Sequence, residues 1–365
     1  MLKNSFDLVT HSLEFGERVL AKRTEASRKA SGQFFTPATV ARFMAQQLGP
    51  LQSGARVLDP ALGSGVLACA VIERAIAAGQ PVEFWLDGYE IDPELGQVAS
   101  EVLREATKWA AAQGIIVHAQ VHPGDFILKG VPAAQPYLFM AESSNHAGPH
   151  SLYSHIIANP PYFKLNSSDP RVKAVDGQIK GHTNIYTLFI ALAVKKLTPR
   201  GKACFIVPRS FCSGVYFSAF RQELIQEALP LAVHLFESRQ DTFKNDAVLQ
   251  ENIIFTFQRR YIRSRQIPLA ASLTISTSKD ASELTHRPMS RQVQLKQFLN
   301  QRYGHLFFRL PTGELDEQIV EMMDQWTGSL SQYGLEVSTG PVVAFRAQSW
   351  LTDVEAVVSN NSTFA

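Results

Sequence analysis

The residues of this chain best suited to do chemistry are Asn159, Pro160, Pro161 and Tyr162, within the octet Ile-Ile-Ala-Asn-Pro-Pro-Tyr-Phe at 156–163. The apolar run before them predicts a buried strand, and the prolines end that strand and stiffen the turn after it. An amide, fixed carbonyl groups and an aromatic ring then lie at a strand's carboxyl end, where open α/β sheets bind ligands. Such a set suits a planar group with an amino nitrogen, because the oxygens accept its N–H hydrogens while the ring stacks on it. Taken alone, the tetrapeptide fits a structural Pro-rich turn about equally well.

A glycine-containing loop and two acidic residues predict a second site, for an adenosine cofactor. The loop Asp59-Pro-Ala-Leu-Gly-Ser-Gly65 joins a predicted strand to a predicted helix, and Glu90 and Asp125-Phe126 follow the next two predicted strands. Glycines let the backbone approach a ligand, and an acid after the second strand can bind ribose hydroxyls. Asp125 can accept from an adenine amino group, with the Phe126 ring beside it. Each feature alone could be structural, but three successive strand ends together favour a binding site.

The loop departs from the two common phosphate-binding patterns. Position 68 is Ala, so the dinucleotide pattern Gly-x-Gly-x-x-Gly is incomplete, and no Lys follows Gly65 as a P-loop requires. S-adenosylmethionine fits instead, because it has a ribose and an adenine but no phosphate. Its ammonium and sulfonium charges favour an acid such as Asp59 near the amino-acid tail.

Composition limits the class of protein. The chain has 365 residues, of which 45% are hydrophobic and 19% charged, with a formal net charge of +2. It is therefore long enough for a full α/β domain. Its net charge is too small to indicate, by itself, that the protein binds nucleic acid. The three cysteines form no Cys-x-x-Cys pair, which argues against a zinc site or a disulfide framework. With no signal-peptide pattern and no apolar segment of spanning length, we expect a soluble cytoplasmic protein without membrane contact.

Predicted strands and helices alternate through most of the chain, which implies a doubly wound, mainly parallel sheet. The predicted strands cover 56–58, 84–89, 115–121, 156–158 and 203–207. The later apolar runs 232–236 and 252–257 are expected to form an antiparallel closing hairpin. We also expect a helical segment within 5–30, a surface excursion at 131–151 and a mobile polar loop at 164–182.

In their order, these segments resemble the N6-adenine DNA methyltransferases of the gamma arrangement, which are related to restriction–modification enzymes of the Eco57I type. Gly32-Gln-Phe-Phe-Thr-Pro37 resembles the family's N-terminal cofactor-binding motif, and Asn159-Pro-Pro-Tyr162 resembles its catalytic motif. Phe243 resembles, more loosely, the aromatic residue that packs on the target base opposite Tyr162. The matching segments run in the family's order over residues 30–257.

The resemblance implies a fold, a domain organisation and a reaction. The fold is the α/β, doubly wound, mainly parallel seven-stranded Rossmann-like sheet of S-adenosylmethionine-dependent methyltransferases, with an N-terminal helical segment and a C-terminal extension. The domains are a helical segment with the cofactor-binding motif at 1–50, the catalytic domain at 51–258, and a basic linker with the start of a target-recognition region at 259–365. The reaction is site-specific methylation of adenine N6 in double-stranded DNA, within a restriction–modification system, on a base flipped out of the duplex.

The resemblance and the residue chemistry together give the expected site residues. Catalysis is assigned to Asn159, Pro160, Pro161 and Tyr162, and stacking on the target base to Tyr162 and Phe243. We expect the cofactor to contact Phe34, Thr36, Pro37, Asp59, Ala61, Gly63, Gly65, Glu90, Ile91, Asp125, Phe126 and Asn159. No metal site is predicted. A basic stretch forms either a solvated face or a contact to DNA phosphates, and it begins with Arg259, Arg260, Arg263 and Arg265.

Three further interpretations remain open at this stage. Residues 338–346 resemble a segment that leads into a long target-recognition domain in such enzymes, and the chain ends at Ala365. Sequence-specific reading of DNA is therefore expected to need a separate recognition subunit or a missing C-terminal domain. Methylation of protein glutamine or of RNA guanine N2 is the rival activity, because some such enzymes share Asn-Pro-Pro-Tyr and the glycine loop. A truncated, inactive cofactor-binding subunit is the non-enzymatic alternative.

Overall fold

The computed structural model describes residues 7–24, 35–130, 152–175, 184–237, 251–261, 266–286, 288–302, 304–328 and 330–336. The chain divides into two compact units, Met1–Thr312 and Gly313–Ala365. The first unit holds the sheet and the expected catalytic residues. In the second unit, the described residues form helix α11 (Glu314–Asp324) and the 3-10 helix η5 (Leu330–Tyr333).

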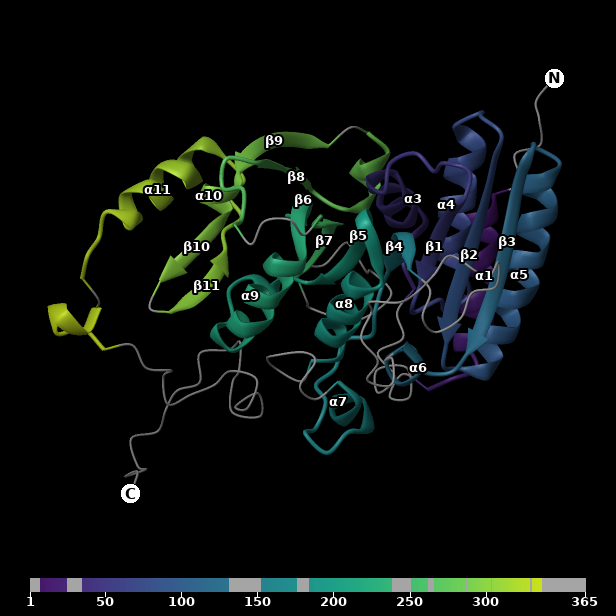
Figure 1. Cartoon of the computed structure of the whole chain (residues 1–365), viewed down its shortest axis with the longest axis horizontal. Helices are drawn as coiled ribbons and strands as arrows, with labels where there is room; N and C mark the ends of the chain where they lie inside the picture. Colours follow the sequence, from purple (N-terminus) through teal and green to yellow (C-terminus); the bar gives the residue numbers. More distant parts are fainter. Residues whose placement is uncertain are drawn as a thin grey trace, which may run out of the picture. The chain divides into compact units, whose positions relative to one another are not determined.

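The first unit is built on one mixed sheet with helices on both faces (Figure 1). Strands β1 to β5 pair in parallel, and β7 is antiparallel to both β5 and β6. This pairing confirms the doubly wound, mainly parallel sheet and its closing hairpin. The order along the sheet is β3 (Ile115–Pro123), β2 (Val82–Glu90), β1 (Ala55–Asp59), β4 (Tyr153–Ala158), β5 (Leu197–Pro208), β7 (Asn252–Arg259), β6 (Ala228–Phe236), β8 (Ser272–Ser278) and β9 (Met289–Gln294).

The described sheet has nine strands, which corrects the expected count of seven. The first seven in sequence are the expected ones, and β8 then extends the sheet in parallel from β6, with β9 antiparallel at the edge. Both extra strands come from the stretch that the sequence assigned to a linker, so the compact unit continues beyond residue 258 to Thr312. Strand β8 is rich in serine and threonine and β9 is mostly polar, so neither carries much of the apolar signal that identifies strands.

Two apolar cores form, one on each face of the sheet. One core is covered by α1 (Leu8–Leu20), α3 (Ala38–Gln47), α4 (Val66–Ala77), α5 (Pro93–Ala111) and the 3-10 helix η4 (Ala281–Thr285). The other is covered by α6 (Phe126–Gly130), α8 (Ile185–Lys195), α9 (Ser218–Glu227), α10 (Leu295–Phe298) and the hairpin of β10 (Leu299–Arg302) and β11 (His305–Phe308).

Side-chain alternation along β4 shows how the sheet separates these cores. Ile156 and Ala158 point into the core with α8, whereas Ile157 points into the core with α4. All three are fully buried, as expected for a strand in the middle of a two-faced sheet. Because β4 is held in the middle of the sheet, it fixes the position of the backbone of Asn159, the next residue.

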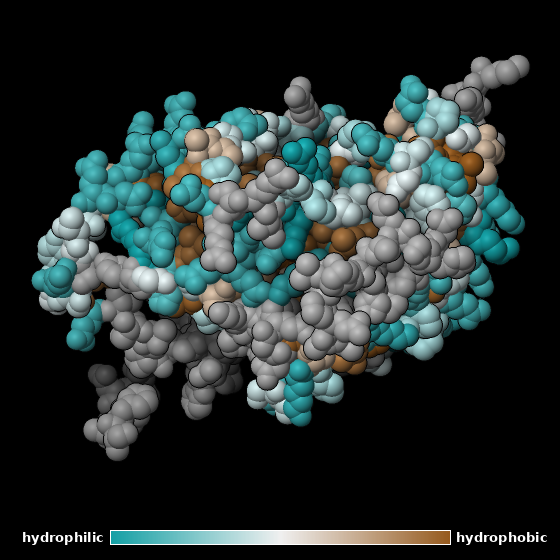
Figure 2. Space-filling view, in the orientation of Figure 1, coloured by the Kyte–Doolittle hydropathy of each residue, from teal (hydrophilic) through white to brown (hydrophobic). Residues whose placement is uncertain are grey.

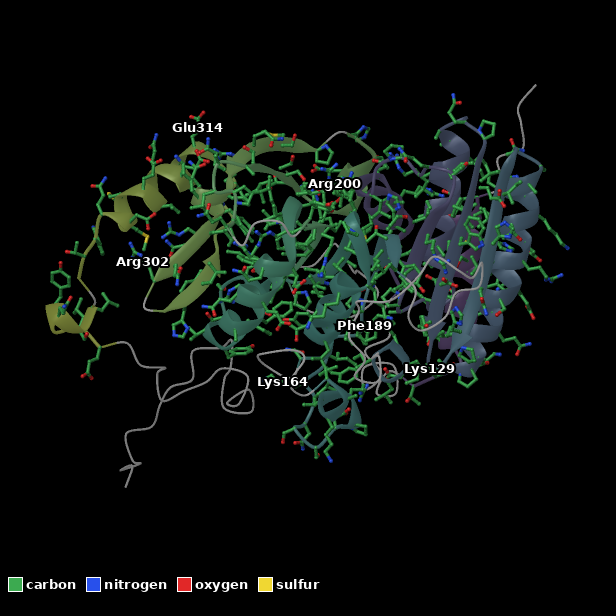
Figure 3. The ribbon with its side chains drawn as sticks, in the orientation of Figure 1. Lys129, Lys164, Phe189, Arg200, Arg302 and Glu314 are labelled. Carbon is green, nitrogen blue, oxygen red and sulfur yellow. The ribbon has the colours of Figure 1, made fainter. Side chains whose placement is uncertain are left out.

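The carboxyl ends of the parallel strands carry the connections that build the site. Here lie α6, α7 (Pro170–Ala174) and the 3-10 helices η2 (Arg209–Cys212) and η3 (Val215–Phe217). Helix α6 contacts both α7 and α8, and Figure 3 marks Lys129 on the chain of α6 near Phe189 of α8. Elsewhere the face drawn in Figure 2 is largely hydrophilic. Among the described residues, no helix has the length and apolarity needed to cross a membrane.

Candidate active site

A cavity of about 460 Å³ lies where β1, β2, β3 and β4 end. It is large enough for a nucleoside-sized ligand. Most residues that were expected to contact the cofactor line it, from five separate parts of the chain: Thr36, Ala61, Gly63, Glu90, Ile91, Asp125, Phe126 and Asn159. Pro161, from the expected catalytic tetrapeptide, also lines it. The parallel arrangement brings these strand ends to one edge of the sheet, as the sequence predicted.

Other expected residues lie next to the cavity rather than on its wall, or outside the described residues. Pro37, Asp59, Gly65, Pro160 and Tyr162 are described but do not line it. Phe34 and Phe243 fall outside the described residues, so their assignments stay predictions. Phe35, the neighbour of Phe34, lines the cavity.

The glycine loop owes its shape to two left-handed residues. Gly63 has φ 57° and Gly65 has φ 94°, a conformation that favours glycine. Gly65 is the N-cap of α4, so the helix begins directly after the loop. The Gly63 N–H donates to Glu90 Oε2 at 2.7 Å, which holds the loop against the end of β2.

Asp59 is a buried carboxylate with an unsatisfied oxygen. Its side chain is 1% exposed, and Oδ1 accepts from the Ala61 N–H at 3.1 Å. Oδ2 has no hydrogen-bond partner among the described residues. Burial, with a smaller contribution from the charge of Glu90, raises the pKa of Asp59 to about 8. A cation or donor brought to this oxygen would therefore be bound favourably.

Glu90 also lies mostly out of water, at 8% exposed. Its two oxygens accept from Gly63 N–H and, at 2.8 Å, from Asp92 N–H. Desolvation raises its pKa in spite of these bonds. Each carboxylate oxygen has two lone pairs, so these contacts leave capacity for the hydroxyl groups of a ribose.

Asp125 and Phe126 follow the end of β3, and α6 begins at Phe126. Asp125 Oδ1 accepts from the N–H groups of Ile127 at 2.7 Å and Leu128 at 3.2 Å, so this carboxylate caps the helix. Phe126 is buried, with its ring 5.5 Å from that of Phe189. The cap therefore fixes where the carboxylate sits at the cavity edge.

Two hydroxyl groups orient the Asn159 amide. Asn159 Nδ2 donates to Thr36 Oγ1 at 3.1 Å, which joins the N-terminal motif to the catalytic one. The Tyr162 hydroxyl lies 2.6 Å from Asn159 Oδ1 and 2.8 Å from the Ile206 carbonyl oxygen. Burial raises the pKa of Tyr162 well above that of a free phenol, so it is a neutral donor near pH 7. The amide therefore presents its oxygen in a defined direction.

This contact suggests a role for the Tyr162 hydroxyl besides the stacking expected of its ring. We expect Tyr162→Phe to lower kcat by about two- to tenfold, the equivalent of one hydrogen bond, because Asn159 loses one of its orienting partners. Tyr162→Ala should lose considerably more, since the ring is lost too. Steady-state kinetics with parallel cofactor titrations would measure both effects. Equal kcat for wild type and Tyr162→Phe would show that the hydroxyl does not contribute to catalysis by orienting Asn159.

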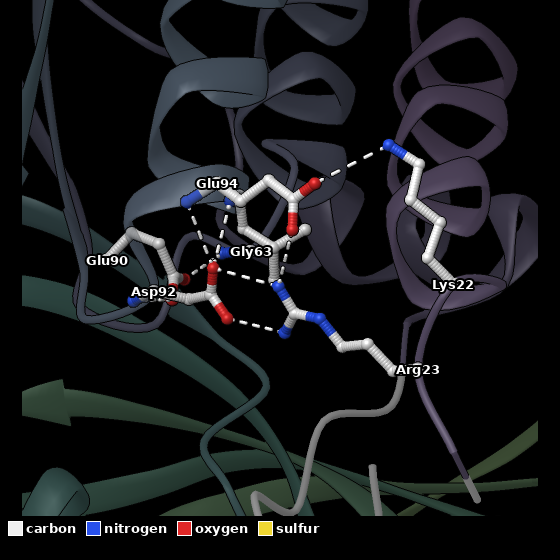
Figure 4. Close-up of polar contacts among 7 residues, drawn as sticks. Lys22, Arg23, Gly63, Glu90, Asp92 and Glu94 are labelled. Atoms are coloured by element: carbon white, nitrogen blue, oxygen red, sulfur yellow. Dashed lines mark hydrogen bonds and ion pairs between the residues drawn. The ribbon is translucent and has the colours of Figure 1, made fainter. Parts of the chain in front are cut away.

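An ion-pair cluster connects the turn after α1 to the start of α5 (Figure 4). The Arg23 guanidinium donates to both oxygens of Asp92, at 2.5 and 3.1 Å, and to Glu94 at 3.1 Å. Asp92 also caps α5, accepting from the N–H groups of Glu94 and Leu95. Since Glu90 accepts from the Asp92 N–H, the cluster connects α1 through Asp92 and Glu90 to Gly63.

We expect Arg23→Ala to lower the free energy of unfolding by roughly 1–2 kcal/mol, because it breaks a charge-assisted bidentate pair. Lys22→Ala is the matched control, since Lys22 is 73% exposed and lies 3.6 Å from Glu94. Surface pairs of that kind contribute little. Urea unfolding of Arg23→Ala, Asp92→Asn and the double variant Arg23→Ala/Asp92→Asn would measure the coupling of Arg23 with Asp92. Additive effects of the two substitutions would contradict it.

Arg259 and Arg260 are not positioned for DNA phosphates, which corrects that expectation. Arg259 pairs with Glu227 and its side chain is 16% exposed. Arg260 is 9% exposed, and its guanidinium donates to the carbonyl oxygens of Ile225, Gln226 and Gln266. Both arginines therefore stabilise the connections around β7. Arg263 and Arg265 fall outside the described residues.

The sequence did not identify several residues of the cavity wall. Four come from the segment after the catalytic tetrapeptide and from the helix that follows it: Phe163, Arg171, Ile185 and Phe189. Ile185 and Phe189 lie on α8, a helix whose residues from Ile185 to Val194 are all buried. A helix that is apolar all round has no polar face. Its sequence therefore cannot distinguish the residues that line the cavity from those that pack in the core.

Comparisons with known proteins bear on the family of the chain. Two family models match the chain, the Eco57I restriction-modification methylase over residues 136–243 and the N-6 DNA Methylase over residues 7–101. The chain is 32% identical over 324 residues to the Type II methyltransferase M.BsuBI of Bacillus subtilis, covering 88% of this chain and 60% of that protein. It is 29% identical over 329 residues to the Type II methyltransferase M.PstI of Providencia stuartii, covering 90% and 61%. The chain thus spans about 60% of the length of these relatives.

Solved structures agree on the fold. A structure of the DrdV–DNA complex matches with a TM-score of 0.54 and 16% identity, over 86% of this chain and 34% of that one. The M protein of the type I restriction enzyme EcoKI matches with a TM-score of 0.50 and 10% identity, over 82% and 74%. The resemblance found in the sequence is confirmed, because the chain is similar to Eco57I-type restriction–modification methyltransferases over most of its length.

Proposed function

We propose that the chain methylates adenine N6 in double-stranded DNA, with S-adenosylmethionine as methyl donor. The observation that carries the proposal is the place of Asn159. Its amide is oriented by Thr36 and Tyr162, and it also lines the cavity that Glu90 and Asp125 border. A methyl acceptor held by Asn159 would thus lie beside a cofactor held in the cavity.

The residues present fit this cofactor. The buried Asp59 Oδ2 has no partner among the described residues, and it suits the ammonium group of an amino-acid tail. Glu90 suits the ribose hydroxyls, and Asp125 suits the adenine amino group. An added Cβ at Gly63 would lie 3.4 Å from the Phe35 ring, an ordinary contact, so it is the positive φ of Gly63 that favours glycine here. S-adenosylmethionine, when bound, supplies an electrophilic methyl group on a sulfonium.

The chain's own residues then act by position and electrostatics. Asn159 Oδ1 and the Pro160 carbonyl oxygen each accept one N6 hydrogen of the extruded adenine. These bonds draw the nitrogen toward sp³ geometry and direct its lone pair at the methyl group. The Tyr162 ring contacts the base, and its hydroxyl holds Asn159 in place. The N6 proton leaves after methyl transfer, so no strong base is required.

The acceptor class can be tested directly. The purified chain, given S-adenosylmethionine with a labelled methyl group, is incubated separately with unmethylated mixed-sequence DNA, total RNA and a protein extract. The proposal predicts label in DNA. Label in RNA or in protein would favour guanine-N2 or glutamine methylation instead. Cofactor binding without transfer to any acceptor would favour a non-catalytic subunit.

A further inference from the structure

Arg171 is a cavity residue to which neither the sequence nor the mechanism above gives a role. It lies on α7, which begins after Asp169 with Pro170 at its first position. Its side chain is 21% exposed and lines the cavity beside Asp125. Helix α7 contacts α6, the helix that Asp125 caps. The guanidinium therefore lies at the end of the cavity assigned to adenine.

The guanidinium is held in one orientation. Nε and Nη2 donate to the two oxygens of Asp169, at 2.9 and 2.7 Å, as a fork. The Phe163 ring lies beneath it, with Arg171 Cζ 5.4 Å from the ring centroid. Nη1 lies 3.8 Å from Asp125 Oδ2. One edge and one face of the guanidinium are thus occupied by the protein. Because the side chain is already held in one orientation, it loses little further conformational entropy when a ligand binds.

This environment does not suit a DNA phosphate. Two carboxylates lie within 4 Å of the guanidinium, at Asp169 and Asp125, and balance its charge. A flat, charge-balanced and largely buried guanidinium is instead suited to contact an aromatic ring.

We propose that Arg171 binds the adenine ring of the cofactor, next to Asp125. The inference rests on the cofactor site proposed above. Arg171 and Phe163 also belong to the segment that directly follows Asn159-Pro-Pro-Tyr162. A cofactor held by Arg171 therefore stabilises the same segment that receives the target base, so cofactor and DNA increase each other's affinity.

Calorimetry on the full chain tests the contact with three ligands: S-adenosylmethionine, S-adenosylhomocysteine and adenosine. Arg171→Ala should weaken all three by a similar factor, about 5- to 30-fold, because they share the adenine. Arg171→Lys should lose most of the same affinity, since it keeps the charge but not the planar fork. Lys173→Ala is the matched control, because Lys173 is an exposed cation of the same helix that does not line the cavity.

The outcomes separate this inference from the proposed function. Wild type that binds none of the three ligands would overturn both. Wild type that binds them, with Arg171→Ala binding equally well, would overturn the role of Arg171 alone. A loss confined to the two ligands that carry an amino-acid tail would also overturn it, because the contact would not be to adenine.

The coupling between cofactor binding and DNA binding can be measured separately. Saturating S-adenosylhomocysteine should tighten the binding of mixed-sequence duplex DNA to wild type and to Lys173→Ala. In Arg171→Ala the ratio of DNA affinities with and without saturating S-adenosylhomocysteine, which is the factor of tightening, should fall toward one. A merely structural role would leave that factor unchanged. Equal factors in wild type and Arg171→Ala would therefore overturn the coupling.

Discussion

Asn159→Ala is expected to lose methyl transfer by roughly 10²- to 10³-fold, the range seen when one oriented polar contact to a transition state is removed. The loss should fall on kcat, because the Asn159 oxygen acts on the target base rather than on the cofactor. S-adenosylmethionine affinity should change little. Steady-state kinetics and calorimetry on the same preparations would show whether the two quantities separate.

Thr36→Val is the informative companion to that variant. Thr36 Oγ1 accepts from Asn159 Nδ2, and Val keeps the shape while it removes the acceptor. A smaller loss of kcat in the same direction is expected, since the amide is then held by fewer bonds. A large, equal loss of cofactor affinity in Asn159→Ala would mean that Asn159 holds the cofactor, and its assignment to the base would be wrong.

Asp59→Asn is expected to change stability and cofactor affinity in opposite directions. In the cofactor-free chain the buried carboxylate lacks a partner for Oδ2 among the described residues. A neutral amide of the same shape should raise the free energy of unfolding by roughly 1–3 kcal/mol at pH 8 and above. The same change should weaken S-adenosylmethionine binding, because the ammonium group loses its counter-charge.

The pH dependence follows from the direction of the Asp59 shift. Its pKa rises from 3.8 to about 8 on folding, so between these values the folded chain binds more protons than the unfolded chain. The contribution of Asp59 to stability is full below about pH 4 and is lost as the pH rises through about 8. Denaturant unfolding at several pH values should show this decline in wild type and a flatter profile in Asp59→Asn. Parallel profiles for the two proteins would contradict the raised pKa.

The sequence was sufficient to predict the centre of the sheet and the groups at its edge. In a parallel sheet, residues that follow successive strands must meet at the same end, and apolar runs identify those strands. The site could therefore be assembled from Asp59, Glu90, Asp125 and Asn159 without coordinates.

What the sequence could not show depends on long-range partners. From its sequence context Arg260 would be expected at the surface. In the structure its guanidinium instead donates to three backbone carbonyl groups. Strand β8 has too few apolar residues to be identified alone, and it forms by pairing with β6. Arg171 lies in a polar stretch, and only the contact between α7 and α6 brings it to the cavity.

The proposed role of Asn159 in methyl transfer to adenine N6 can be tested on DNA. Its most direct test is to incubate unmethylated duplex DNA with the purified chain and labelled S-adenosylmethionine, digest the DNA to nucleosides, and identify the labelled nucleoside by mass spectrometry. We expect N6-methyl-2′-deoxyadenosine with wild type and almost none with Asn159→Ala. Label on a cytosine or guanine nucleoside, or undiminished N6-methyladenine with Asn159→Ala, would contradict it.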